Sequence, residues 1–141
     1  MFAPPMSLQE EMRAIASNAK AAARQMTRLT TQEKNACLIS MANALEANAE
    51  AIKAANEKDM ATGRSMNLSS AMQDRLQLDD SRIAAMAKGL HEVAEFEDPV
   101  GRVLDERTRP SGLHLRKVSA PIGVIVMIYE SRPNVTADAA G

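Results

Sequence analysis

An unbroken apolar run followed at once by a polar loop constrains the fold of this chain more than any other feature. Residues 121–134 read PIGVIVMIYESRPN, and the run at 124–128 is rich in β-branched side chains. Such a run is typical of a strand with both faces buried, as in a parallel sheet covered by helices. A lone strand cannot bury itself, so the sequence predicts the first strand of an α/β sheet, with a ligand-binding loop at its carboxyl end.

The residues before this sheet segment have the apolar periodicity of helices. A capping-box pattern at 7–10 predicts a helix start, and a second one at 30–33 predicts a long helix that stops near Gly63. A short helix is expected at 70–76, and DDS at 79–81 caps the next helix. The predicted apolar faces are Leu8, Met12, Ile15, Ala19, Ala22, Met26 and Leu29 in the first helix, Leu38, Met41, Leu45 and Ile52 in the second, and Ile83, Met86, Leu90 and Ala94 in the last.

Two short strand-like segments lie between the helices and the apolar run. Residues 102–108 and 113–118 flank RPSG, in which Pro110 and Gly112 stand where a type I turn accepts them. We therefore expect a β-hairpin. The sequence predicts a mostly α-helical segment in three parts: a helical part over 1–101, the hairpin over 102–120, and the incomplete start of a Rossmann-like sheet over 121–141.

Charge and composition argue against several classes of partner. A formal charge of -1 over 141 residues gives no electrostatic reason to expect nucleic acid or an anionic membrane surface. The aromatic residues that would stack on single-stranded bases are limited to Phe2, Phe96 and Tyr129. No stretch has the length of a membrane span, and the first residues lack a secretory signal. With its single cysteine, the chain is predicted to be cytoplasmic, without a nucleic-acid or membrane partner.

The cysteine is predicted to be structural, and the two histidines are predicted to lie on the surface or at a rim. Cys37 falls inside a predicted helix with no histidine near it in sequence, so we interpret it as a small, partly buried side chain. His91 and His114 do not stand at metal-ligand spacing with each other or with Cys37. The sequence therefore predicts no nucleophile and no metal site in this chain.

The loop ESRPN at 130–134 is the candidate functional site. Arg132 offers a fixed fork of donors for a phosphate or a carboxylate, and Pro133 favours an extended conformation for it. Asn134 has two possible roles: its amide can donate to an oxyanion, or its side chain can cap the helix that follows. Glu130 and Ser131 complete this substrate or cofactor loop.

The segments YESRPNVT at 129–136 and PIGV at 121–124 resemble the signature of the gamma-glutamyl phosphate reductase family, in the aldehyde dehydrogenase superfamily. The resemblance extends upstream through NLS at 67–69, DRL at 74–76, RI at 82–83, DPVG at 98–101 and RPSGL at 109–113. It implies an α/β parent fold of the aldehyde dehydrogenase type, of which this chain is an amino-terminal segment. It also implies a homo-oligomer that forms through the hairpin at 102–120.

The resemblance further implies an activity, the NADPH-dependent reduction of L-glutamate 5-phosphate to L-glutamate 5-semialdehyde and phosphate in proline biosynthesis. In this family a cysteine thiolate displaces phosphate to form a thioester, which hydride from the cofactor reduces. Asn134 matches the asparagine that stabilises the oxyanion. The family's nucleophilic cysteine does not align with Cys37, so we expect this chain alone to be inactive. The alternative, from another class, is a non-catalytic helical interaction or oligomerisation module whose apolar stripes bind a partner.

Overall fold

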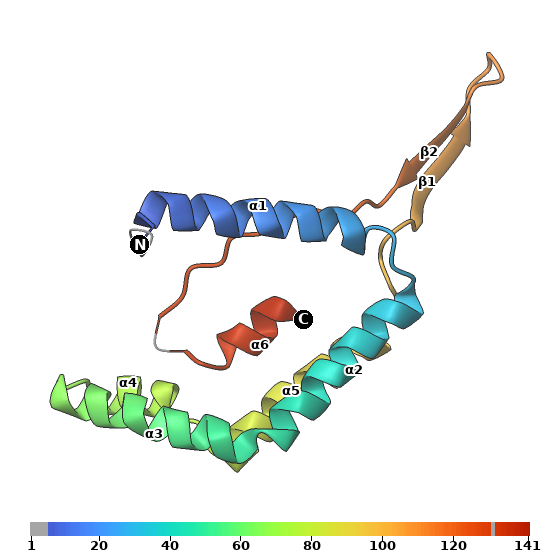
Figure 1. Cartoon of the computed structure of the whole chain (residues 1–141). Coiled ribbons are helices and arrows are strands. Elements are labelled where there is room, and N and C mark those ends of the chain that lie inside the picture. The colour runs from blue at the N-terminus through green and yellow to red at the C-terminus, as the bar shows by residue number, and fades with distance from the viewer. Residues whose placement is uncertain (1–5, 131) are drawn as a thin grey trace. The chain divides into compact units, whose positions relative to one another are not determined.

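A computed structural model describes residues 6–130 and 132–141, so the candidate loop residue Ser131 and the aromatic Phe2 lie outside the described residues. The described part contains six helices and a two-stranded antiparallel sheet (Figure 1). In chain order the elements are α1 (Leu8–Met26), α2 (Thr31–Ala47), α3 (Ala49–Ser65), α4 (Ser70–Leu76), α5 (Asp80–Glu95), β1 (Val103–Thr108), β2 (His114–Val118) and α6 (Val135–Ala140). They form two compact units, Met1–Thr30 with Glu97–Val126, and Thr31–Phe96 with Met127–Gly141.

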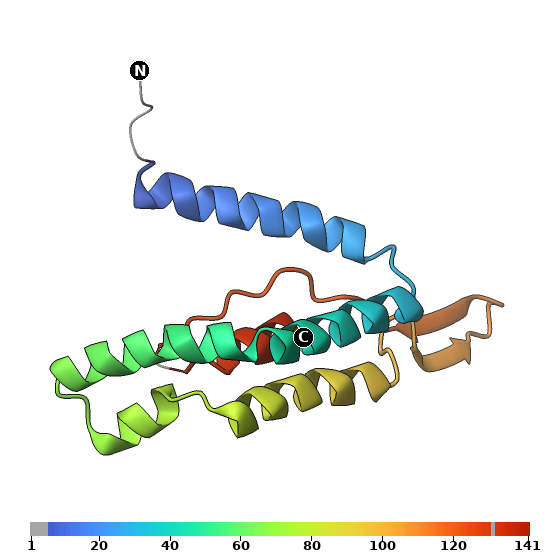
Figure 2. The same ribbon diagram turned by 60° about the horizontal axis from the view of Figure 1, so that its bottom comes forward.

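The second unit is a helical bundle in which α2 and α5 lie side by side (Figure 2). Its core is a cluster of Ala42, Ala87 and Leu90, against which Leu38, Met41 and Leu45 pack. Small alanines at this contact allow the two helices to approach closely. The amide of Asn35 adds a hydrogen bond across the pair, to the carbonyl oxygen of Ala94 at 2.7 Å. The predicted apolar faces of these two helices are thus confirmed.

The predicted long second helix is interrupted. α2 ends at Ala47 and α3 begins at Ala49, and Asn48 between them has φ −106° and ψ 15°. The Asn48 side chain donates to the carbonyl oxygen of Ala44 at 2.8 Å. A side chain that binds the carbonyl four residues earlier competes with the regular helix ladder, and this explains the break.

The prediction that Gly63 stops the helix is wrong, because Gly63 is buried inside α3. The stop is Asn67, which has φ +54°, a left-handed conformation that asparagine tolerates better than most residues. The Leu68 N–H donates to the Gly63 carbonyl at 3.1 Å, and the Asn67 N–H donates to the Arg64 carbonyl at 3.1 Å, which together form a Schellman motif. A Cβ on Gly63 would lie 3.1 Å from Leu68 Cδ1, so a larger residue here would require the leucine side chain to shift by a few tenths of an ångström.

In the first unit, α1 begins where the capping box predicts. The Ser7 N–H donates to Glu10 Oε2 at 2.8 Å, and the Glu10 N–H donates to Ser7 Oγ at 3.3 Å. The bond from the Ser7 backbone, followed by the bond that the Ser7 hydroxyl donates to Glu10 Oε2 at 2.7 Å, lowers the pKa of the Glu10 carboxyl. The apolar stripe of α1 is not buried, since Met12 and Ile15 are 49% and 54% exposed. Within residues 6–30 and 97–126, the structure supplies no apolar face that covers the stripe.

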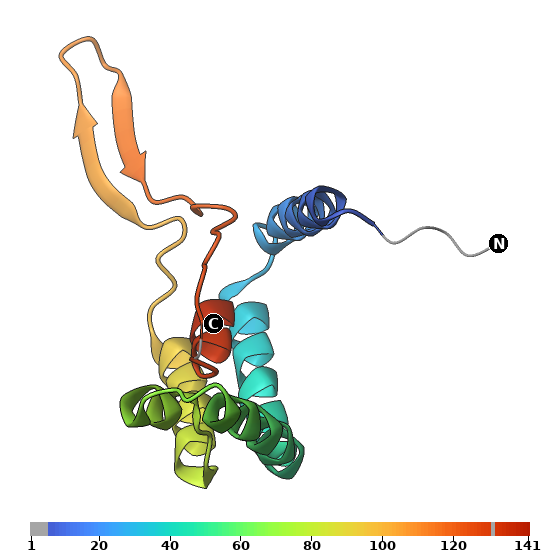
Figure 3. The same ribbon diagram turned by 90° about the vertical axis from the view of Figure 1, so that its left-hand side faces the viewer.

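The hairpin is confirmed. β1 and β2 pair antiparallel from Val103↔Val118 to Thr108↔His114, with an irregularity after Val103. The turn is closed by the Gly112 N–H, which donates to the Arg109 carbonyl at 2.9 Å, and Gly112 has φ +83°. Figure 3 shows the two strands as a twisted ribbon, the usual shape of an isolated hairpin.

The predicted strand at 124–128 does not form. The structure describes no strand from 119 to 130, and Val126 and Ile128 are 81% and 94% exposed. A strand requires a neighbour for its backbone donors and acceptors. Among the described residues β1 and β2 pair only with each other, and neither pairs with this segment. The described part of the chain is therefore mostly helical with one antiparallel hairpin, and the first strand of a parallel sheet that we expected is not formed in it.

Candidate functional site

A cavity of about 360 Å³ in the second unit brings part of the candidate loop together with the α4–α5 connection. Arg132 and Asn134 line it, whereas Glu130 is exposed and does not. The full lining is Asp74, Arg75, Gln77, Leu78, Arg82, Ala85, Met86, Arg132, Asn134 and Asp138. Two of the predicted site residues thus meet side chains that lie far from them in the sequence.

The turn that carries Arg132 and Asn134 is held at both ends. The Val135 N–H donates to the Arg132 carbonyl at 3.0 Å, and the hydroxyls of Tyr129 and Thr136 are hydrogen-bonded at 2.7 Å across the loop. α6 then packs on α5 and buries Ala137 (Figure 3). These contacts place the loop beside the cavity.

Asn134 stands at the N-cap position of α6, but its side chain does not cap the helix. Its backbone is already helical, with φ −61° and ψ −31°. Its Nδ2 donates instead to Asp138 Oδ2 at 3.0 Å. An amide nitrogen carries two hydrogens, so the second one can serve a ligand. The side-chain capping role is therefore not observed, and the amide is held at the cavity by Asp138.

Arg82 locks the α4–α5 connection. Its Nη2 bonds Asp74 Oδ1 at 2.8 Å, and its Nη1 donates to the Gln77 carbonyl at 2.8 Å and also to the carbonyl of Asp74. The planar guanidinium therefore clamps a backbone segment that includes Arg75. Because its donors are used internally, Arg82 contributes positive charge to the cavity and is not its main ligand-binding group.

Arg75 and Arg132 differ from Arg82. Within the described part of the chain, neither side chain makes a hydrogen bond or an ion pair, and both residues are exposed to solvent at the cavity. Of the two aspartates that line the cavity, Asp74 pairs with Arg82, and Asp138 accepts from Asn134. The cavity thus offers two guanidinium groups with open donors, the arrangement that binds carboxylate or phosphate.

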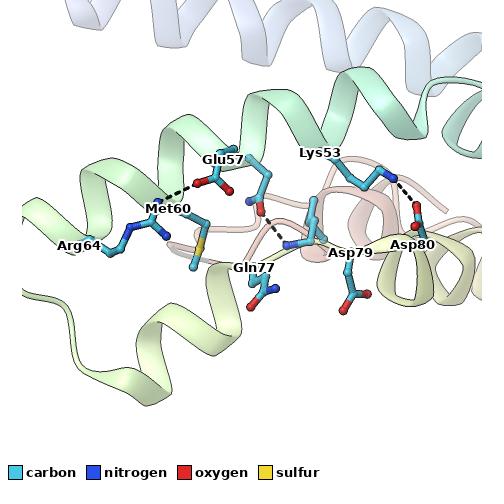
Figure 4. A pocket seen from close by; sticks show the side chains of 9 residues that line it. Lys53, Glu57, Met60, Arg64, Gln77, Asp79 and Asp80 are labelled. Atoms are coloured by element: carbon cyan, nitrogen blue, oxygen red, sulfur yellow. Dashed lines mark hydrogen bonds and ion pairs between the residues drawn. The ribbon is translucent and has the colours of Figure 1, made fainter.

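A second cavity, of about 330 Å³, lies between α3 and the α4–α5 connection (Figure 4). Its charges pair internally: Lys53 Nζ lies 2.6 Å from Asp80 Oδ1, and Arg64 Nη2 lies 2.8 Å from Glu57 Oε1. The hydrogen bond to Asp80, followed by that to Glu50, raises the pKa of Lys53. This cavity is held by structural pairs and does not present an open binding group.

Cys37 is exposed on α2, which corrects the predicted partial burial. The stripe of α2 that packs on α5 runs through Leu38, Met41 and Leu45, and Cys37 is not part of it. His114 Nδ1 lies 2.9 Å from Thr108 Oγ1 across the hairpin, a structural contact. In the described residues the structure shows no cluster of His, Cys, Asp and Glu that could hold a metal, and no helix long and apolar enough to span a membrane.

Comparison with solved structures identifies the class of protein. A chain from Thermotoga maritima matches with a TM-score of 0.85 and 38% identity, and the match covers 89% of this chain and 30% of that one. A chain from Saccharomyces cerevisiae matches with a TM-score of 0.85 and 37% identity, and the match covers 96% of this chain and 34% of that one. Both proteins are reductases, so the fold of this chain is that of a segment of a reductase.

Both solved structures are gamma-glutamyl phosphate reductases, and so are the curated relatives. The relative from Caldanaerobacter subterraneus subsp. tengcongensis is 54% identical over 131 residues, which is 93% of this chain and 32% of the relative. The relative from Geotalea daltonii is 52% identical over 135 residues, which is 96% of this chain and 32% of the relative. No protein-family model matches the sequence. The chain belongs to the gamma-glutamyl phosphate reductase family and spans about a third of the length of these relatives.

Sequence reasoning missed Arg75, Arg82 and Asp138 as residues of this cavity. A partial signal was present, because DRL at 74–76 and RI at 82–83 were among the segments that carried the resemblance. Nothing in their spacing indicated that they would face the loop at 132–134. Their role follows only from the packing of α6 on α5.

Proposed function

We propose that this chain is an amino-terminal segment of a cytoplasmic enzyme that reduces L-glutamate 5-phosphate to L-glutamate 5-semialdehyde and phosphate with NADPH, a step of proline biosynthesis. The observation that carries the proposal is 54% identity over 131 residues to a gamma-glutamyl phosphate reductase. The open arginine donors at the cavity support it, because the substrate carries a carboxylate at one end and a phosphoryl group at the other. An aldehyde dehydrogenase-type α/β fold for the whole enzyme is part of the same proposal.

In this proposal the loop binds and polarises the substrate. Arg132 holds an anionic group of the substrate, and Asn134 donates its second amide hydrogen to the oxyanion that develops at the acyl carbon. Glu130 and Ser131 belong to the same loop as substrate or cofactor residues. The cysteine nucleophile comes from outside this chain, because Cys37 is on the surface of α2 and not at the cavity.

The described residues do not by themselves fit the cofactor. Binding of the pyrophosphate of a dinucleotide typically uses a Gly-rich turn between a strand and a helix at the edge of a parallel sheet. The described part of the chain has a two-stranded antiparallel sheet and no such turn. We therefore derive no step through NADPH, and the proposed NADPH dependence rests on the resemblance and on the reductase names of the relatives.

The hairpin is proposed to join subunits of a homo-oligomer. All residues of β1 are exposed, and each strand pairs on one side only, so two backbone edges are open. Open edges of this kind pair readily with a strand of another chain. This supports association through residues 102–120.

An exchange of segments tests the proposed function. In the Caldanaerobacter relative, the 131 matching residues would be replaced by those of this chain. The exchanged enzyme should reduce glutamyl phosphate at the expense of NADPH, or catalyse the reverse reaction with semialdehyde, phosphate and NADP⁺.

The chain alone is the control and should stay at background, since covalent catalysis is almost abolished without its nucleophile. A folded, soluble exchanged enzyme without activity would favour the alternative of an interaction module, to which the exposed stripe of α1 would then belong.

A further inference from the structure

Arg75 is a charged group of the cavity that lies outside the candidate loop. It lies in the last turn of α4 and lines the cavity together with Arg132, although 57 positions separate them in the sequence. Both side chains are exposed at the cavity, and within residues 6–130 and 132–141 neither has a hydrogen-bonding partner. An arginine that merely stabilises the fold normally spends its donors on protein acceptors, as Arg82 does.

The neighbours of Arg75 hold its backbone in place. Arg82 donates to the carbonyls of Asp74 and Gln77, and these two residues flank Arg75 in the chain. The Gln77 N–H also donates to the Gln73 carbonyl at 3.0 Å, which closes the last turn of α4. The Cα of Arg75 is thus fixed while its side chain stays open to a ligand, which reduces the cost of binding.

The charge balance of the cavity favours an anion. Three arginines and two aspartates line it, and both aspartates already have partners, Arg82 and the Asn134 amide. Two guanidinium forks at one cavity can bind two edges of one oxyanion, or bind two anionic groups of a short molecule. A volume of about 360 Å³ suits a small metabolite.

We propose that Arg75 is a second substrate-binding arginine, which acts with Arg132 to hold the oxyanion groups of the substrate, and that Arg82 is its positioning residue. The ligand chemistry is that of a phosphoryl group or a carboxylate on a small acyl phosphate. This inference rests on the proposed function, because it takes the ligand to be the substrate of that reaction.

Steady-state kinetics of the exchanged enzyme test the proposal. With Arg75→Ala, KM for the acyl phosphate should rise about tenfold. If the arginine binds the carboxylate, which does not react, kcat should stay within about twofold, whereas kcat should fall as well if it binds the phosphoryl group that leaves. In the reverse reaction a rise in KM for inorganic phosphate assigns Arg75 to the phosphoryl group, and a rise in KM for semialdehyde assigns it to the carboxylate. Arg75→Lys should recover only part of the loss, since lysine keeps the charge without the fork.

Two further variants separate binding from folding. Arg28→Ala removes an exposed arginine that is not at the cavity and should leave both KM values unchanged. Arg82→Ala should raise the same KM as Arg75→Ala, and the double variant should show little additional effect, because the two residues act through one contact. Unchanged KM values for Arg75→Ala in an active enzyme would overturn the proposal while the proposed function stands.

Direct binding gives a readout that does not need activity. Inorganic phosphate and L-glutamate would be titrated into the chain, with the arginine side-chain N–H signals followed by NMR. At least one of the two anions should shift the signals of Arg75 and Arg132, more weakly at high salt. If binding depends on both arginines but the exchanged enzyme is inactive, the anion site stands and the proposed reaction fails. If neither anion moves the Arg75 signal, the inference is wrong.

Discussion

Asn56 ties α3 to the α4–α5 connection, and its removal should cost more than any exposed polar substitution on the same helices. Its side chain is 5% exposed. Nδ2 donates to the Leu76 carbonyl at 2.8 Å, and Oδ1 accepts from the Leu78 N–H at 2.7 Å. The two bonds join residues that are 20 and 22 positions apart in the sequence, so they are tertiary contacts.

The magnitude for Asn56→Ala follows from these two bonds. Each contributes a net of about 1 kcal/mol, and the stranded carbonyl and N–H each add a penalty where water does not reach them. Asn56 and Leu78 line the second cavity, whose volume of about 330 Å³ admits some water and lowers that penalty. Alanine also improves helix propensity by up to about 0.7 kcal/mol. We expect a net loss of about 2 kcal/mol in the free energy of unfolding.

The matched control is Asn43→Ala, the same substitution at an exposed position of α2. The gain in helix propensity is common to both variants. The difference in urea midpoint between them therefore measures the contribution of the two Asn56 hydrogen bonds. Hydrogen exchange gives a local readout, since the Leu78 amide should lose its protection only in the Asn56 variant. A difference below about 0.5 kcal/mol, the size of an ordinary surface effect, would refute the reasoning.

Asn56→Asp extends the test to pH. The carboxylate still accepts from the Leu78 N–H but faces the Leu76 carbonyl, and together with burial this raises the pKa of the new side chain. A carboxyl with a raised folded pKa binds more protons in the folded state. The variant should therefore gain stability as the pH falls, opposite to the behaviour of most carboxylates. A variant that loses stability in acid as the parent does would contradict this sign.

Three other substitutions have expected outcomes. Asn67→Ala should lower the free energy of unfolding by about 1 kcal/mol because of its left-handed backbone, while Asn67→Gly should not; equal losses in urea would argue against the strain. The Ser81 hydroxyl is the main cause of the lowered pKa of Asp79. The stability that Asp79 contributes is therefore present above its unfolded pKa and is lost as the pH falls through its lower folded pKa. Asp79→Asn should make the free energy of unfolding fall less steeply at acid pH. An unchanged acid dependence would contradict this prediction. In the exchanged enzyme, Asn134→Ala should lower kcat by about 10²–10³, and Asp138→Asn should lower it much less; a normal kcat for Asn134→Ala would reject the oxyanion role.

Local signals in the sequence predicted the helix starts well. Ser7 caps α1 through a bond with a residue three positions away, and Asp79 caps α5 in the same way, with its Oδ1 2.8 Å from the Arg82 N–H. Such motifs need no information from the rest of the fold. The burial of Gly63 was not predictable, because its cause lies in Leu68 and Leu76, which the Schellman turn brings back onto α3. The spacing of apolar residues in the sequence does not show that these two leucines pack against α3.

The candidate site was predicted only as far as its loop. Arg132 and Asn134 stood out because a restricted polar loop followed an apolar run. Arg75 has no such local mark, and only the packing of α6 on α5 shows that it shares the cavity. The strand at 124–128 failed for a related reason, since a strand depends on the backbone of its neighbours as much as on its own side chains.

If chains associate through the exposed run at 124–128, temperature should distinguish two ways in which it holds them together. Its side chains, from Val124 at 43% to Ile128 at 94% exposed, present apolar surface, and its backbone presents unpaired donors and acceptors. Attraction between apolar side chains weakens on cooling, because hydration of such surface becomes less unfavourable. Pairing of backbones into a shared ladder does not depend on that hydration. Assemblies that dissolve on ice are therefore held by side chains, and those that persist have added strands to one another.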